Sequence, residues 1–577
     1  MYRKVVSVVL AYTLLSLAFN VTLRPALSQG GLTSQESQIV ALVNGTSAYN
    51  YALKLEEIAL NHSVSKYSFR VGGSVGASET AKWIEAQFKS FGLEAYMESF
   101  EFTNWTLLSQ PELVIDYDGN VLTGDNQILI KSFQSAHYSW PTSQSGVFAD
   151  LVVLPLPEAA NHNEVGTRPI NTALWNAVNT AGKILLVGKE VRWSSSWEQT
   201  FKSKLTAQPP AAVIYTWWYD WMNFTPPMFS SGGGRPMSSL GAYYWNLTIP
   251  VGWVNYEDGL LIRNKEDDLN VSARVSINSV IGFGSHYNVI GRLQGSVDPE
   301  KLIIVSGHYD TVMTSGFCDN AAGTAGVIEL ARIFSEAVEK GLYAPKYTVL
   351  FVAFASEELW LVGSVNYVRQ HKAQMEDIIA VVNVDSIGSD ELAISETPGD
   401  NLDIDGLVWE AARDLNVSAR LISPGSSDQE AFRDPARSNL FYMLWGLDAN
   451  ISDAVPVRSS TMISSSPILY SDKWFLGKPG WLHTSYDNST STQTLSWVEP
   501  DDLQDQIRVA ALSVMRVSSP APSAPSEPFS WLTQTTTVVF TVVAAVVLVV
   551  VIVYLAKVRK PPPSQFEEVP VQEGAVF

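Results

Sequence analysis

The stretch VSGHYDTV, residues 305–312, places an imidazole and a carboxylate two positions apart at the end of an apolar run. That run, residues 302–305, is typical of a buried strand, so His308 and Asp310 would stand at its tip. Such side chains suit a metal site in which a carboxylate holds the second nitrogen of a ligand imidazole. A surface turn that contains both residues by chance is the alternative that this stretch alone leaves open.

More carboxylates and a second imidazole come after other apolar runs. Glu357 and Glu358 follow shortly after the run of residues 347–355, the run of residues 377–385 ends in Asp385, and a loop near residue 483 carries the imidazole. Each position taken singly has a simpler interpretation, as a helix cap, a solvated corner or a structural histidine. The candidate positions are Asp319, Glu357, Glu358, Asp385, His483 and Asp487.

The elements that would position these residues alternate between apolar runs and helical patterns from about residue 300 to 390. Uniformly apolar strands suit a sheet covered on both faces, and their alternation with helices predicts a parallel sheet. Because ligands gather at the carboxyl ends of such strands, we expect the candidates to meet at one edge. The expected strands are residues 301–307, 347–355 and 377–385, and the expected helices are 319–338, 361–371 and 78–93, the last capped by Ser78.

The candidates together meet the needs of two neighbouring zinc ions. Zinc takes imidazole nitrogen and carboxylate oxygen, and two ions about 3.5–4 Å apart need a bridging carboxylate. Glu357 is then left beside the metal as a natural general base, and Asp310 can fix the tautomer of His308. The expected zinc ligands are His308, Asp319, Glu358, Asp385 and His483.

Five motifs, GHYDTV, CDNAAG, SEEL, NVDSIG and LHTSYD, resemble in this order the motif blocks of the co-catalytic zinc exopeptidases, peptidase family M28. The resemblance spans most of residues 65–515. It implies an α/β fold in which helices sandwich a mixed, mostly parallel sheet of the phosphorylase/hydrolase-like type. The implied roles are His308 and Asp385 for one zinc ion, Glu358 and His483 for the other, Asp319 as the bridge, Glu357 as the base and Asp310 behind His308.

Residues 139–277 break the strand–helix pattern and are expected to form a β-rich insert. The segments GKILLVGK, AAVIYTWW and IPVGWVNYEDG resemble a protease-associated (PA) domain, which many family members carry before the first zinc ligand. An aromatic cluster in the insert is expected to pack a domain interface, with the lining of a substrate cleft as the alternative. The cluster is Tyr215, Trp217, Trp218, Tyr219 and Trp221.

Two positions depart from the family's pattern. Cys318 precedes the expected bridging ligand, where a thiol is not usual, and we expect it to be a small buried residue and not a ligand. In PGSSDQEAF, residues 424–432, Gln429 stands where the family often has histidine after aspartate. This second departure concerns substrate preference and leaves the metal site intact.

Both ends of the chain carry segments typical of a membrane-anchored extracellular protein. Arg3 and Lys4 precede the apolar residues 5–19, which predicts a signal peptide cleaved near Ser28, with an uncleaved anchor as the alternative. Residues 538–556 are long and apolar enough to cross a bilayer, and basic residues come directly after them. These features predict a single-pass protein of the cell membrane with its catalytic domain outside.

Composition agrees with this location. The formal net charge of −20 argues against nucleic-acid partners, and the single cysteine excludes an intrachain disulfide. Nine Asn-x-Ser/Thr sequons after the signal suggest a glycosylated surface. They begin at Asn44, Asn61, Asn104, Asn223, Asn246, Asn270, Asn416, Asn450 and Asn488.

The sequence thus predicts a zinc exopeptidase that acts on peptide substrates. An aminopeptidase is favoured because no basic residue for a terminal carboxylate lies in the motif blocks. A carboxypeptidase of the glutamate-carboxypeptidase type, a one-zinc glutaminyl-cyclase-like transferase and an inactive receptor-like ectodomain are the alternatives. The expected organisation is a signal peptide (1–28), the first part of the catalytic domain (29–138), the PA-like insert (139–277), the main catalytic domain (278–516), a Pro/Ser-rich linker (517–535), a transmembrane helix (536–556) and a cytoplasmic tail (557–577).

Overall fold

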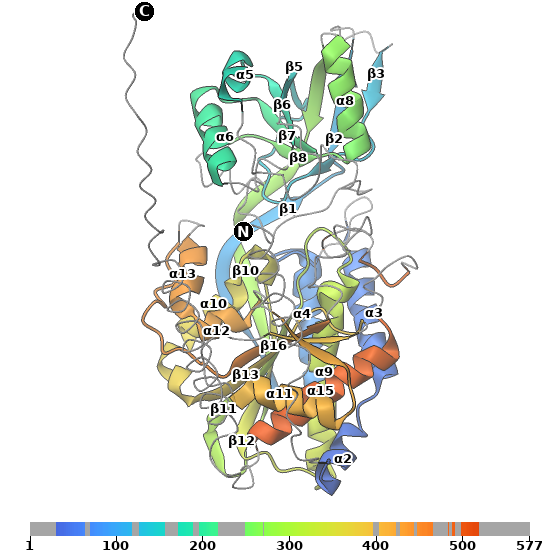
Figure 1. Ribbon diagram of the computed structural model, residues 1–577, viewed down its shortest axis with the longest axis vertical. Coiled ribbons are helices and arrows are strands. Elements are labelled where there is room, and N and C mark those ends of the chain that lie inside the picture. The colour runs from blue at the N-terminus through green and yellow to red at the C-terminus, as the bar shows by residue number, and fades with distance from the viewer. Residues whose placement is uncertain are drawn as a thin grey trace, which may run out of the picture. The chain divides into compact units, whose positions relative to one another are not determined.

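The computed structural model describes most of residues 31–518 (Figure 1). The expected signal peptide, transmembrane helix and cytoplasmic tail lie outside these residues. Within the described part, no helix is both long and apolar enough to cross a bilayer. Also outside it are residues 64–69, 118–125, 156–170, 189–194, 217–247, 269–270, 390, 396–402, 423–426, 444–446, 466–482, 484–486 and 491–497.

An eight-stranded sheet carries the candidate site. Its central strands β12, β11, β13 and β16 are parallel, whereas β10 pairs antiparallel with both β12 and β1. The predicted mixed α/β fold is therefore confirmed. In spatial order the strands are β1 (Glu94–Leu107), β10 (Ser279–Leu293), β12 (Tyr347–Phe354), β11 (Asp298–His308), β13 (Ile378–Val384), β16 (Ser460–Ser465), β14 (Leu392–Ser395) and β15 (Ala419–Ile422).

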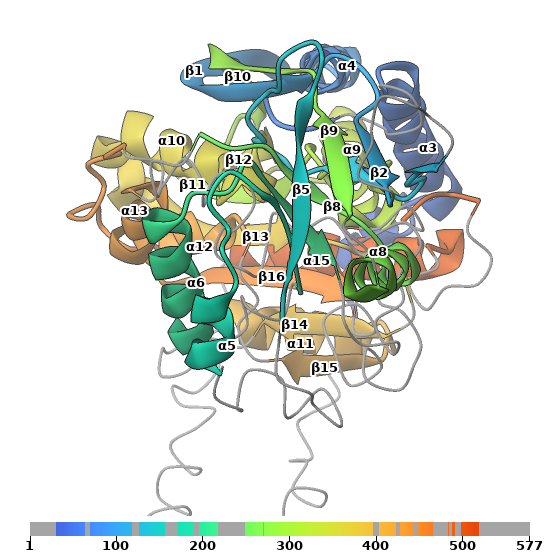
Figure 2. The same ribbon diagram turned by 90° about the horizontal axis from the view of Figure 1, so that it is seen from above.

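Helices lie on both sides of this sheet because its central strands are apolar on both faces. Every residue of β12 after Tyr347 is buried, as the uniformly apolar sequence predicts. Figures 1 and 2 show α3, α9 and α15 on one side of the strands and α10, α12 and α13 on the other. The helices are α2 (Ser34–Val40), α3 (Gly45–Asn61), α4 (Val75–Ser90), α9 (Gly323–Glu339), α10 (Val362–Gln370), α11 (Asp403–Asp414), α12 (Gln429–Arg433), α13 (Pro435–Met443) and α15 (Pro500–Ser518).

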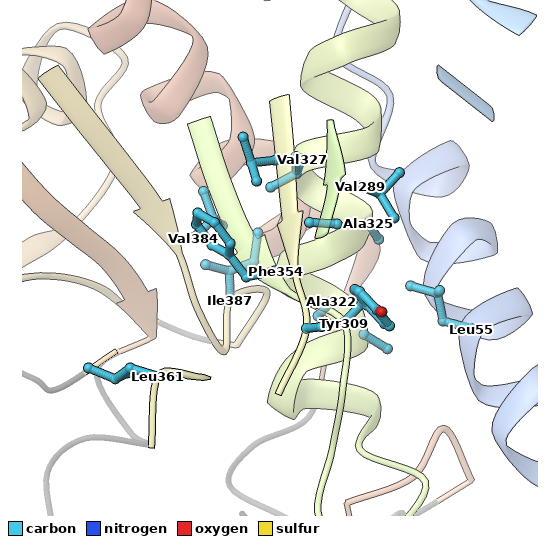
Figure 3. Packing of buried hydrophobic residues seen from close by; sticks show 14 of the residues in the cluster. Leu55, Val289, Tyr309, Ala322, Ala325, Val327, Phe354, Leu361, Val384 and Ile387 are labelled. Atoms are coloured by element: carbon cyan, nitrogen blue, oxygen red, sulfur yellow. The ribbon is translucent and has the colours of Figure 1, made fainter. Parts of the chain in front are cut away.

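The core beneath the site lies between α9 and the central strands. Figure 3 shows Ala325 and Val327 of α9 beside Val384 and Phe354 at the strand ends, with Leu55 of α3 on the far side of the helix. All five side chains are almost fully buried. Close packing of this kind holds the strand ends in place, because a well-filled interior resists displacement.

Helix α4 begins earlier than the sequence predicts. Its N-cap is Ser74, whose hydroxyl accepts from the backbone N–H of Ala77 at 3.1 Å. The expectation that Ser78 caps this helix is wrong, since Ser78 lies in the helix's first turns. Gly76 conceals the true start because glycine lowers local helix propensity, while the cap and the packed face decide where the helix begins.

A second sheet of eight strands holds the expected insert. Strands β5 to β8 pair in parallel, and antiparallel strands complete both edges. The sheet also takes in β2, β3 and β4 from residues 112–135, upstream of the expected boundary at residue 139. Its spatial order is β3 (Gln127–Leu129), β2 (Glu112–Asp116), β9 (Ser272–Ser276), β5 (Val147–Leu154), β6 (Ile184–Gly188), β7 (Ala212–Thr216), β8 (Val251–Trp253) and β4 (Gln134–Ser135).

Helices also cover the second sheet, so the insert is less purely β-rich than expected. Figures 1 and 2 show its strands between α5 and α6 on one side and α8 on the other. The reason is that β6 and β7 are buried at every residue, and such strands need cover on both faces. The three helices are α5 (Thr172–Ala177), α6 (Ser195–Ala207) and α8 (Tyr256–Asp268).

Candidate metal centre

The carboxyl ends of three parallel strands deliver most of the candidate residues. His308 is the last residue of β11, Glu357 and Glu358 open the 3₁₀ turn after β12, and Asp385 comes directly after β13. Asp319 lies in the turn Phe317–Ala322, directly before α9. His483 arrives from a distant loop. The edge of the sheet therefore collects every residue that the motifs singled out as a ligand.

Two groups of potential metal donors meet at Asp319. In the first group, His308 Nε2 lies 3.3 Å from Asp319 Oδ1 and 3.6 Å from Asp385 Oδ1. In the second group, His483 Nε2 lies 3.2 Å from Asp319 Oδ2 and 3.1 Å from Glu358 Oε1. The two oxygens of one carboxylate thus face two different imidazoles, which is the arrangement that a bridging ligand needs.

The donor set fits zinc in type and in electrostatics. Imidazole and carboxylate are both ordinary zinc ligands, and each group supplies one imidazole and two carboxylates. Burial favours neutral His308, yet the carboxylates of Asp385 and Glu357 raise its pKa well above the usual range. Burial opposes charge on His483 in the same way, and Glu358 raises its pKa. The same negative charge that favours protonated imidazoles would favour a metal cation bound in place of the protons.

Glu357 stands beside the donor groups without belonging to either. Its Oε2 lies 3.9 Å from His308 Nε2, and its side chain keeps 13% of its surface exposed. Burial raises the pKa of this carboxyl group well above its usual value, and the neighbouring Glu358 raises it further. A carboxylate with raised basicity at the edge of a metal centre can accept a proton from water.

Asp310 holds the neighbouring turn more directly than it holds His308. Its carboxylate oxygens accept from the backbone N–H groups of Glu357 at 2.9 Å and Glu358 at 3.3 Å. The nearest carboxylate oxygen lies 3.6 Å from His308 Nδ1, whereas the backbone carbonyl of Asp310 lies 3.2 Å from that nitrogen. Both the main chain and the carboxylate of Asp310 therefore lie beside His308 Nδ1, and the carboxylate also fixes the turn that carries Glu357.

Two residues that organise the loop of Asp319 were not assigned roles from the sequence. Asp487, which the motif LHTSYD contains, accepts from the backbone N–H of Cys318 at 2.6 Å and of Asp319 at 3.1 Å. Arg70 is completely buried and donates to the carbonyls of Tyr309, Ser315 and Gly316 at 2.8–2.9 Å. No sequence pattern could have found Arg70, because it precedes the loop by 239 positions or more.

The two departures from the family pattern lie in buried surroundings. Cys318 is buried, as expected, and neither donor group includes its thiol. Gln429 is also buried, and its amide oxygen accepts from Asn383 of β13 at 3.3 Å. Of the aromatic cluster, only Tyr215 is among the described residues, where it packs against Trp253 within the second sheet. The cluster's expected role at a domain interface stays a prediction.

The chain is similar in sequence to known peptidases. Residues 288–510 match the model of Peptidase family M28. Aminopeptidase YwaD of Bacillus subtilis (strain 168) is 26% identical over 422 residues, which cover 73% of this chain and 76% of the relative. Aminopeptidase NAALADL1 of Mus musculus is 27% identical over 157 residues, and a probable zinc metalloprotease of Pyrenophora tritici-repentis is 32% identical over 179. These last two matches span only 20% and 39% of the relatives' length.

Solved structures share the fold over most of this chain. The zinc aminopeptidase BSAP from Bacillus subtilis aligns with a TM-score of 0.56 at 19% identity, over 84% of this chain and 97% of its own. The aminopeptidase from Aneurinibacillus sp. strain AM-1 aligns with a TM-score of 0.55 at 21% identity, over 85% and 98%. The fold and the donor groups define the class of zinc metallopeptidases. Within that class, the sequence match to the model of Peptidase family M28 covers residues 288–510 of this chain.

Proposed function

We propose that this protein is a two-zinc aminopeptidase that removes residues from the amino terminus of peptides. The observation that carries the proposal is the placement of Asp319, whose two oxygens face His308 and His483. Asp319 would be shared by two ions, with Asp385 as a further ligand in one donor group and Glu358 in the other. The names of two relatives, YwaD and NAALADL1, support the aminopeptidase class.

The residues around the donors have separable tasks in this proposal. Bound zinc would supply a Lewis acid that polarises the scissile carbonyl and lowers the pKa of water. Glu357 takes a proton from the attacking water and returns it to the leaving amine, so that the net reaction adds one water across the peptide bond. Asp310 keeps Glu357 at its place by holding the backbone of the turn. Asp487 and Arg70 keep Asp319 at its place.

The charge around the site favours an amino terminus over a carboxyl terminus as the bound end. Arg70 lies near the site, but its guanidinium is buried and donates to three main-chain carbonyls. It is therefore not available to bind the terminal carboxylate of a substrate. Glu357 and Asp428 are neighbouring carboxylates that belong to neither donor group, and such a group can attract the substrate's ammonium group.

The deciding experiment compares two substrate sets on the purified zinc-loaded protein. Amino-acid p-nitroanilides with a free amine should be cleaved, and N-acetylated dipeptides should not. Cleavage of the blocked dipeptides alone would establish the carboxypeptidase, and cleavage of neither set with both ions bound would favour the inactive ectodomain. Zinc content by elemental analysis should be about two ions per chain, as in two-metal hydrolases; a single ion would favour the cyclase-like alternative.

We also infer that the protein acts outside the cell and is held at the membrane by residues 536–556, and that the second sheet is a PA-type domain. The apolar composition of residues 538–556 and the basic residues after them support the anchor. Extraction of full-length protein with detergent but not with salt tests the anchor. Surface labelling of intact cells with a membrane-impermeant reagent tests the orientation.

A further inference from the structure

A string of polar groups, fully buried at His286 and Ser356, runs from the antiparallel strands β1 and β10 to the turn that carries Glu357 and Glu358. Asn104 of β1 lies against the Nε2 of His286 of β10, and the Nδ1 of His286 lies 2.6 Å from the hydroxyl of Ser356. Ser356 directly precedes the two glutamates and is completely buried. The chain runs from β1 into β2 and from β9 into β10, and both β2 and β9 belong to the second sheet. The string therefore lies on the two strands that lead to and from that sheet.

The direction of each hydrogen bond in the string can be assigned. The amide nitrogen of Asn104 donates to the carbonyl of Gly73 at 3.2 Å, so its oxygen is the atom that faces His286. His286 must then carry its proton on Nε2, which leaves Nδ1 as an acceptor for the hydroxyl of Ser356. Burial lowers the pKa of His286 to about 4, which keeps the ring neutral and this tautomer intact.

The neighbourhood is shaped to admit these three side chains. A Cβ on Gly72 would lie 2.3 Å from the Ser356 hydroxyl, and one on Gly73 would lie 2.1 Å from the Asn104 oxygen. Gly73 also has a φ of +79°, which glycine adopts most readily. Phe100 stacks on the His286 ring with centroids 5.4 Å apart, and this packing covers one face of the imidazole.

Ser356 has the geometry of a residue that must be held. Its φ of 60° is in the left-handed region, which is unfavourable for a residue with a side chain. Its carbonyl accepts from the backbone N–H of Leu359 at 3.3 Å and of Val362 at 3.1 Å, which closes the turn over Glu357 and Glu358. Asp310 holds the backbone of the turn from the other side. Fixing the Ser356 side chain therefore completes the restraint on both glutamates.

We propose that Ser356, held by His286 and Asn104, is a positioning residue that sets the placement of Glu357 and Glu358. The role of Glu357 rests on the proposed function, whereas the placement of Glu358 as a metal donor can be measured without substrate. The three side chains act as one unit, because each satisfies its neighbour's remaining hydrogen-bonding group.

The test starts with Ser356→Ala, with Ser513→Ala as the matched control because Ser513 is an equally buried serine in α15. Zinc affinity is measured by chelator competition. Ser356→Ala should weaken one of the two ions by about 10-fold or more, as loss of a group that orients a ligand does, and spare the other. It should lower kcat by about 10- to 100-fold with KM within twofold, because displaced catalytic groups slow the chemical step. The control should change neither quantity.

A double-mutant cycle tests whether the string acts as a unit. His286→Phe should reproduce the loss of Ser356→Ala, and the double variant should lose no more than either single variant. If the losses of zinc affinity and kcat multiply in the double variant, the side chains act independently and the proposed unit is wrong. If His286→Phe does not fold, Ser356→Ala alone decides: unchanged zinc affinity and kcat overturn the proposal. Altered zinc affinity in a protein that cleaves neither substrate set leaves the positioning role standing and removes the proposed function instead.

Asn104 requires a separate control because it begins a sequon, Asn104-Trp105-Thr106. Thr106→Ala abolishes that sequon while it leaves the amide of Asn104 in place, and Thr106 is exposed. Asn104→Ala should lower kcat and weaken one zinc ion, and Thr106→Ala should do neither. Equal losses in both variants would assign the effect to a glycan and overturn the role of Asn104 in the string.

Discussion

The two sheets of this protein share a construction and differ in the residues at the ends of their strands. Both have a parallel centre of uniformly apolar strands with helices on both sides. The central strands of the first sheet end in His308, in the pair Glu357 and Glu358, and in Asp385. Within the part of the chain that the structure describes, both groups of potential metal donors lie at the first sheet. Apolar strands therefore identify a covered sheet, and only the residues at their ends identify a site.

The largest effect is expected when the carboxylate shared by the two donor groups of the first sheet is removed. Asp319→Ala should release both zinc ions, because each group loses a ligand and the two ions lose their shared anion. Activity should fall by roughly 10⁴-fold or more, since the loss removes the metal-assisted part of catalysis. Elemental analysis after dialysis measures the metal, with Glu358→Ala as the control that should lose one ion. Retention of both ions by Asp319→Ala at wild-type affinity would reduce Asp319 to a structural residue.

The next largest effect is expected at the base, which lies at the same strand ends but outside the donor groups. Glu357→Gln should keep its zinc and lose about 10²–10⁴-fold in kcat, because the amide cannot accept the proton. Steady-state kinetics and metal content are measured on the same preparation. Near-normal turnover with full zinc would exclude Glu357 as the base.

A matched pair of core substitutions sharpens the comparison between the sheets. Ile304 of β11 and Ile214 of β7 are both fully buried in central parallel strands. Replacing either with Ala should cost about 2–5 kcal/mol of unfolding free energy. Ile304→Ala should also lower kcat, since β11 delivers His308, whereas Ile214→Ala should leave the kcat of the folded fraction unchanged. Denaturant unfolding together with kinetics at low temperature separates the two effects. Equal losses of kcat would show that the second sheet takes part in the reaction.

The smallest expected effect is a pH dependence at the outer part of the first sheet. His371 at the end of α10 forms a hydrogen bond of 2.6 Å with Glu98 of β1. Burial opposes a positive charge on His371, but Glu98 raises the pKa of His371 above its usual value. This pair should stabilise the fold fully below the unfolded pKa of about 6.5 and lose that contribution as pH rises through the raised folded pKa. Glu98→Gln should remove about 0.5–1 kcal/mol at pH 6 and less at pH 9.

The second sheet offers the control for this pH effect. Lys183 pairs with Asp150, whose side chain is 68% exposed. Lysine and aspartate side chains ordinarily keep their charges between pH 6 and pH 9. Asp150→Asn should therefore leave the difference in thermal midpoint between these two pH values unchanged. A flattened pH dependence in Asp150→Asn, or none in Glu98→Gln, would contradict the assignment to His371.

Much of the first sheet could be predicted because its signals are local. The apolar runs that become β11, β12 and β13 are continuous in the sequence, and the residues after each run are fixed by chain connectivity. The rule that parallel strands present their carboxyl ends at one edge then brings His308, Glu358 and Asp385 together without coordinates. Helix starts were less predictable, as the cap at Ser74 shows, because competing serines differ only in their packing.

The sequence by itself determined the types of donor residue, their order and the strands that present them. Only the tertiary structure decided how they are held. Asp310 lies beside the imidazole that its spacing suggested and also accepts from the backbone of Glu357, and Arg70 donates to three carbonyls of a loop more than 200 positions away. Strands from residues 112–135 also join the second sheet, where β2 pairs with the distant β9 and β4 with the distant β8. Hydrogen bonds between distant segments depend on where the packed core places each backbone group, and no local pattern in the chain records that placement.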